Sequence, residues 1–127
     1  MARKLFIQCP QAFTQLLVDA LNLYAKMAFP DSGSPCQMVS RQALTDAAEQ
    51  FAASWRETGQ GEISSRMRPM LNAAIKNYFQ LLAQQNDMTT EHQCQLVLQA
   101  IKSGGIDEQQ WQQAIELDRL AHLESSD

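Results

Sequence analysis

Apolar side chains recur at steps of three and four residues through most of this chain, and the residues that interrupt helices fall between the periodic stretches. This spacing places apolar side chains on one face of an α-helix. Only five glycines and four prolines occur in 127 residues, whereas glutamine, a good helix former, occurs 17 times. The sequence therefore predicts an all-α, single-domain bundle of about five helices with short connections and one longer loop.

The breakers set the expected boundaries of the first two helices. A first helix follows Pro10 and ends just before Pro30, because proline disfavours helical geometry in the residue that precedes it. Proline, glycine and serine then predict the longer loop near residues 30–37. Ser40 is the expected N-cap of a second helix that continues to about Glu57.

Glycines and prolines also frame the third helix. Gly59 or Gly61 can adopt the left-handed conformation that ends the second helix. The third helix begins between Ser64 and Pro69 and runs to about Gln85. Its apolar set is broader than a single stripe, so we expect either a central, buried helix or one with an extra contact face.

Two sequence signals of helix capping mark the starts of the fourth and fifth helices. Thr90 with Gln93, and Asp107 with Gln110, each have the spacing of a capping box, and the glycines of residues 103–105 separate the two helices. Such local signals predict two helices joined by a tight turn.

The fifth helix is expected to begin with a hydrophobic staple. Ile106 and Trp111 occupy the two positions that pack on each other around an N-cap. The expected core face of this helix comprises Trp111, Ala114, Ile115, Leu117, Leu120 and Ala121.

The whole chain, residues 1–127, is expected to form one helical domain. Residues 1–9 are a candidate extended arm, residues 124–127 a frayed tail, and nothing outside the arm reads as a strand. No apolar run approaches the ~20 residues of a membrane span, and the first residues do not resemble a secretory signal. We therefore expect a cytoplasmic protein that does not insert into membranes.

Residues suited to catalysis or metal binding are sparse. Three cysteines cannot form a fully paired disulfide framework, and His92 and Cys94 would diverge on a helix. Cys36, in the polar loop, is the best candidate for a reactive thiol, whereas Cys94 is assigned to the buried side of its helix. Because no catalytic motif accompanies Cys36, we expect no enzyme, no bound metal and no cofactor.

Charge is divided unevenly along the chain. Residues 1–76 carry eight basic and six acidic side chains, whereas residues 77–127 carry two basic and eight acidic ones. Residues 96–121 have the helix–glycine turn–helix order of a DNA-reading motif, but the second helix offers carboxylates where phosphates would approach. An ordinary antiparallel helical hairpin is the simpler interpretation.

The leading functional hypothesis is a small non-catalytic interaction module, a regulator, adaptor or inhibitor that docks on a larger protein assembly. Small size, split charge and surplus methionines and aromatic residues support it. The broad apolar surface of the third helix also suits a homodimer. The alternative function is a nucleic-acid-associated helical module with a basic end. Antiparallel packing of the second and third helices would gather the candidate partner-binding residues Arg56, Arg66, Met67, Arg68 and Met70.

Overall fold

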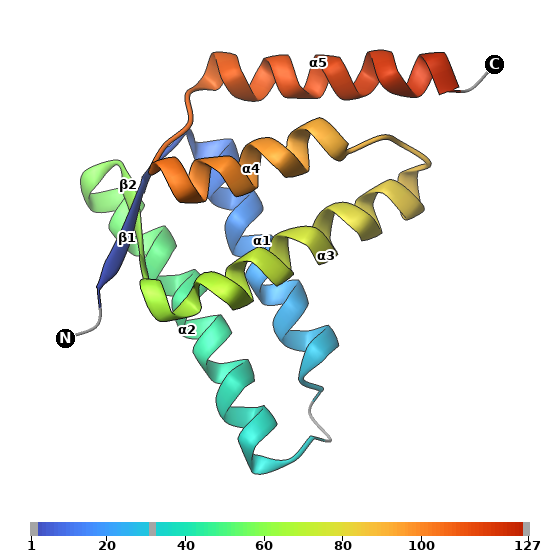
Figure 1. The fold of residues 1–127 in the computed structure, drawn as a ribbon. Coiled ribbons are helices and arrows are strands. Elements are labelled where there is room, and N and C mark those ends of the chain that lie inside the picture. The colour runs from blue at the N-terminus through green and yellow to red at the C-terminus, as the bar shows by residue number, and fades with distance from the viewer. Residues whose placement is uncertain (1–2, 31–32, 126–127) are drawn as a thin grey trace.

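The computed structural model describes residues 3–30 and 33–125 of the chain. These residues form five helices and a two-stranded antiparallel sheet (Figure 1). The predicted helical bundle is confirmed, with the sheet as an addition. In chain order the elements are β1 (Lys4–Gln8), α1 (Gln11–Ala28), α2 (Pro35–Thr58), β2 (Gln60–Ser64), the 3₁₀ turn η1 (Ser65–Met67), α3 (Arg68–Asn86), α4 (Glu91–Ser103) and α5 (Glu108–Ser125).

Helix α1 is the central element of the core. It packs against both α2 and α3, and its Phe13, Leu17 and Leu21 are completely buried. The Phe13 ring also meets the Trp111 ring of α5 edge-on, with 6.0 Å between ring centroids. Helix α3 is not fully buried, because only part of its broad apolar set is in the core and the rest is half-buried against it.

The sheet corrects the expectation that nothing beyond the amino-terminal arm is a strand. β1 pairs with β2 so that Leu5 lies opposite Ile63 and Ile7 opposite Gly61. A Cβ atom at Gly61 would lie 2.1 Å from the Phe51 ring, so β2 approaches α2 closely only because this residue is glycine. Sequence periodicity misses β2 because the strand has five residues and one large apolar side chain.

The other edge of β1 is bound by the link between α4 and α5. The Gln8 N–H donates to the Gly104 carbonyl at 3.0 Å, and the Ile106 N–H donates to the Gln8 carbonyl at 2.9 Å. At the end of the strand, Nε1–H of Trp55 donates to the Cys9 carbonyl at 2.8 Å. Strand β1 therefore lies between two segments that are far from it in the sequence.

Helix α2 begins earlier than the expected N-cap Ser40. Ser34 Oγ accepts from the Gln37 N–H at 3.3 Å, and Gln37 Oε1 accepts from the Ser34 N–H at 3.0 Å. This capping box starts the helix inside the segment that its composition assigned to a loop at residues 30–37. The loop is consequently shorter than expected, and its residues 31–32 lie outside the described residues.

Other helix ends agree with the sequence. Gly59 and Gly104 adopt left-handed backbone angles, with φ of 79° and 89°, at the ends of α2 and α4. Helix α3 starts at Arg68, within the predicted interval.

The two ends of the described chain differ in structure. Much of the expected arm is strand β1, and helix α5 continues through Ser125, into the segment expected to fray. The remaining residues of the expected arm and of the expected frayed tail, 1–2 and 126–127, lie outside the described residues. None of the helices in the described ranges has both the length and the apolar character needed to cross a membrane.

Candidate functional site

The start of α5 is anchored as the sequence predicts. Asp107 Oδ1 accepts from the Gln110 N–H at 2.7 Å, and Gln110 Oε1 accepts from the Asp107 N–H at 3.0 Å, so this capping box is confirmed. Ile106 and Trp111 are both buried in the core. The first turn of α5 is therefore fixed to the rest of the bundle.

The predicted capping box between Thr90 and Gln93 at the start of α4 is wrong, because the Thr90 side chain makes no capping hydrogen bond to α4. The Thr90 hydroxyl donates to the Phe79 carbonyl of α3 at 3.2 Å and does not cap its own helix. The cap comes from Asp118, in the middle of α5. Its Oδ1 accepts from the His92 N–H at 2.8 Å, and its Oδ2 accepts from the Gln93 N–H at 2.9 Å.

This capping carboxylate joins the two helices. Asp118 is only 1% exposed, and the His92 Nδ1 lies 2.9 Å from its Oδ1. A negative charge at a helix N-terminus is favoured by the helix dipole and by the free N–H groups of the first turn. Together with Trp111, this contact holds α5 at a fixed position beside α4, so the surface between them is preformed.

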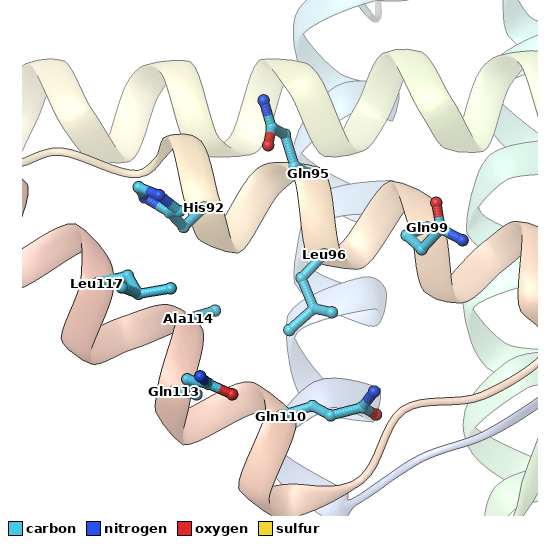
Figure 2. A pocket seen from close by; sticks show the side chains of 8 residues that line it. All are labelled: His92, Gln95, Leu96, Gln99, Gln110, Gln113, Ala114 and Leu117. Carbon is cyan, nitrogen blue, oxygen red and sulfur yellow. The ribbon is translucent and has the colours of Figure 1, made fainter.

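An open groove of about 460 Å³ lies on this surface between α4 and α5. Figure 2 shows Leu96 projecting from α4 toward α5, with Ala114 and Leu117 on the side of α5 that faces α4. These three side chains make the groove apolar at its centre. The remaining lining residues are polar: His92, Gln95, Gln99, Gln110 and Gln113.

Leucines continue along α5 beyond the groove. Leu117, Leu120 and Leu123 are 41%, 44% and 52% exposed. The expectation that Leu117 and Leu120 belong to the core is therefore wrong, because Ala114 and Asp118 occupy the inward-facing positions of this part of the helix. We call the groove together with Leu120 the α4–α5 face.

None of the residues that line the groove is acidic, but the segment that contains α4 and α5, residues 77–127, is acidic overall. Arg119 forms two hydrogen bonds with Glu116, and these bonds lower the pKa of Glu116 below its usual value. This pair contributes little net charge. The excess of carboxylates in residues 77–127 therefore belongs to the remaining acidic side chains of α4, α5 and their connections.

The predicted partner-binding residues are only partly brought together. Helix α2 packs on α1 and β2, and α3 packs on α1 and α4, so the antiparallel pair of α2 and α3 does not form. Strand β2 lies between Arg56 and the pair Arg66 and Arg68 in the chain. These three arginines are exposed, whereas Met67 and Met70 are half-buried beside the core.

The cysteines differ in burial. Cys36 is exposed in the first turn of α2, Cys94 is half-buried and Cys9 is buried. Burial raises the pKa of the Cys9 and Cys94 thiols above the usual value. Within residues 3–30 and 33–125, no three histidine, cysteine or acidic side chains are grouped so that they could hold a metal ion.

Helices α4 and α5 form an antiparallel hairpin (Figure 1).

Comparisons of the chain with family models, curated proteins and solved structures find no match. A function for this chain is therefore inferred from the α4–α5 face and its surroundings.

Sequence patterns could have indicated part of this face. Gln110, Gln113, Leu117 and Leu120 alternate in steps of three and four, which places them on one stripe of α5. That stripe competes with the inward stripe of the same helix. The burial of Trp111, Ala114 and Asp118 in the structure shows which stripe faces inward.

Proposed function

We propose that this protein is a non-catalytic interaction module whose α4–α5 face binds an amphipathic, positively charged helix of another protein. The exposed leucines beside a preformed groove are the observation that carries the proposal. Such a module would act as a regulator, adaptor or inhibitor on a larger assembly. Its three unpaired cysteines suit a reducing compartment, in agreement with a cytoplasmic location.

The shape and composition of the face suit a helix. Contiguous exposed apolar side chains are typical of binding surfaces, and a groove between two helices is a common receptor for an amphipathic helix. Leu96 and Leu117 offer an apolar centre, while Leu120 extends it along α5. Amide groups at the rim, such as those of Gln99 and Gln113, can pair with polar side chains of the bound helix.

Charge favours a basic partner over a second copy of the chain. Residues 77–127 have eight acidic and two basic side chains, so two copies joined through this face would bring like charges together. A partner helix with lysines or arginines beside its apolar stripe meets the opposite potential. The association rate should then decrease as salt concentration increases.

A direct binding measurement tests the proposal. Three labelled synthetic peptides are titrated with the protein and followed by fluorescence anisotropy: a basic amphipathic helix, an acidic one with the same apolar positions, and a basic peptide with scrambled apolar positions. We expect only the first to bind well. Equal binding of the basic and scrambled peptides would show that charge alone is responsible and would contradict a groove.

Substitutions separate this face from other exposed apolar residues. Leu117→Ser with Leu120→Ser should weaken binding of the basic helix by at least about tenfold, because burying one leucine contributes about 1.5–3 kcal/mol. Val39→Ser is the matched control, since Val39 is 70% exposed on α2, outside the groove. Its affinity should match that of the wild type. Loss of binding in the control, or none in the double variant, would refute the proposed location.

Sedimentation of the free protein tests whether a second copy of the chain occupies the α4–α5 face instead. We expect a monomer, for the electrostatic reason given above. A dimer that becomes a monomer after the two leucine substitutions would assign the face to self-association and overturn the proposal.

A further inference from the structure

A small hollow between α3 and α4 is lined by three basic side chains. Arg68 and Lys76 come from α3, and Lys102 comes from the last turn of α4. The hollow has a volume of about 220 Å³, and no acidic side chain is among its lining residues in the described part of the chain. This concentration of positive charge is notable in a chain whose formal net charge is −4.

The remaining lining residues give the hollow two distinct surfaces. Asn72 supplies an amide between Arg68 and Lys76, at steps of four residues along the same face of α3. Leu98 and Ile101 of α4 supply an apolar side. A ligand with a negatively charged group and a short carbon portion would match both surfaces.

The start of α3 adds to the positive potential. Among the described residues, no side chain caps this helix, and its first turn contains no acidic residue. The helix dipole favours a negative charge near the start of α3, although the Arg68 N–H already donates to the Ser65 carbonyl and Pro69 has no N–H. The end of α4 at the same hollow has the opposite dipole, which the charge of Lys102 offsets. A basic residue near a helix C-terminus is ordinary, which explains Lys102 by itself, but this effect does not explain Arg68 at the start of α3.

We propose that this hollow binds a small phosphate monoester, with Arg68, Lys76 and Lys102 around the phosphate and Leu98 and Ile101 against the carbon portion. A phosphate monoester carries about −1.5 to −2 charges at neutral pH, so it suits three cations better than a single carboxylate does. Arginine also presents paired donors that match phosphate oxygens. This inference concerns a surface outside the α4–α5 groove and does not depend on the proposed protein partner.

The volume argues against a nucleic-acid backbone as the ligand. A hollow of about 220 Å³ has room for one phosphate and a few carbon atoms. Nucleic-acid binding uses many phosphate contacts along an extended basic surface, whereas the part of the chain after α3 is strongly acidic. We therefore expect a single small anion to be the occupant.

Titration of the full ¹⁵N-labelled chain with methyl phosphate, at constant ionic strength, tests the site by NMR. We expect saturable shifts at the Asn72 side-chain amide and along residues 98–102. Acetate should bind at least about fivefold more weakly, because it carries one charge and has one fewer non-ester oxygen. No saturation with methyl phosphate, or equal affinity for acetate, would overturn the assignment.

Lysine variants decide whether the binding belongs to this hollow. Lys76→Gln and Lys102→Gln should each weaken methyl phosphate binding by about fivefold or more. Lys26→Gln is the matched control, because Lys26 is an exposed lysine in the last turn of α1 and does not line the hollow. Equal effects of all three substitutions would show general attraction to a charged surface and would refute a site.

A short single-stranded oligonucleotide is titrated as a further probe. We expect it to bind no more tightly than methyl phosphate does. Much tighter binding that is lost in Lys76→Gln and Lys102→Gln would assign these residues to a nucleic-acid surface and overturn the small-ligand proposal. Circular dichroism of each variant verifies that the helices are intact.

Discussion

Replacement of Asp118 is the most direct test of how α5 is attached. Asp118→Ala removes the buried carboxylate and leaves the N–H groups of His92 and Gln93 without their acceptor. Loss of a side-chain cap costs about 0.5–2 kcal/mol, and an unsatisfied buried polar group costs about 1–3 kcal/mol. We therefore expect the free energy of unfolding to decrease by about 2–4 kcal/mol.

The conservative variant separates charge from shape. Asp118→Asn keeps one carbonyl oxygen as an acceptor but places an NH₂ group against the other donor, so we expect a loss of about 1–2 kcal/mol. Urea denaturation followed by circular dichroism gives these differences. Each kcal/mol should lower the melting temperature by roughly 3–5 °C in a domain of this size.

Hydrogen exchange shows whether the loss occurs at the contact itself. In Asp118→Ala, the amides of His92 and Gln93 should exchange faster by more than the global loss of stability explains. Asp46→Asn is the control, because Asp46 is an exposed carboxylate that accepts a hydrogen bond from the Gln42 side chain, and it should change stability by less than about 0.5 kcal/mol. An Asp118→Ala protein as stable as the control, with both amides still protected, would refute the interhelical cap.

Three further results are expected. Trp111→Ala should cost about 3–5 kcal/mol in urea denaturation, because it removes a buried aromatic ring, and an unchanged midpoint would contradict its place in the core. Cys36 should react with a thiol reagent faster than Cys94, whose pKa is raised by burial; faster reaction of Cys94 would show that α4 opens readily. Replacement of Arg66 and Arg68 together by glutamate should leave stability within about 1 kcal/mol, because both are exposed, while loss of basic-helix binding in this variant would move the interface away from the α4–α5 face.

Features that depend on nearby residues could be predicted from the sequence. The apolar period of α1 and the glycines at the ends of α2 and α4 act within a few residues, and all three expectations agree with the structure. The capping box between Asp107 and Gln110 is equally local. Strand β2 could not be found in this way, because it is stabilised by pairing with β1, more than 50 residues earlier in the chain.

Two of the wrong predictions have a common cause. Thr90 has the spacing of a capping residue, but Asp118, 28 residues later, supplies the cap. Asp118 also belongs to the buried stripe of α5 with Trp111 and Ala114, and this stripe leaves Leu117 and Leu120 exposed, although their residue type suggested a core position. Contacts between distant residues therefore set both the start of one helix and the exposed face of another, and this face became the candidate site.

The position of β1 has a consequence for the order in which the fold can be completed during synthesis. Strand β1 is made before both of its neighbours, β2 on one edge and residues 104–106 on the other. When synthesis has reached residue 100, one edge of β1 therefore still lacks its neighbour. Closing this contact brings together segments nearly a hundred residues apart, which carries a large entropic cost and slows folding. Until residues 104–106 are made, the Gln8 edge remains available for pairing with other chains, so the nascent chain is exposed to misassembly up to that point.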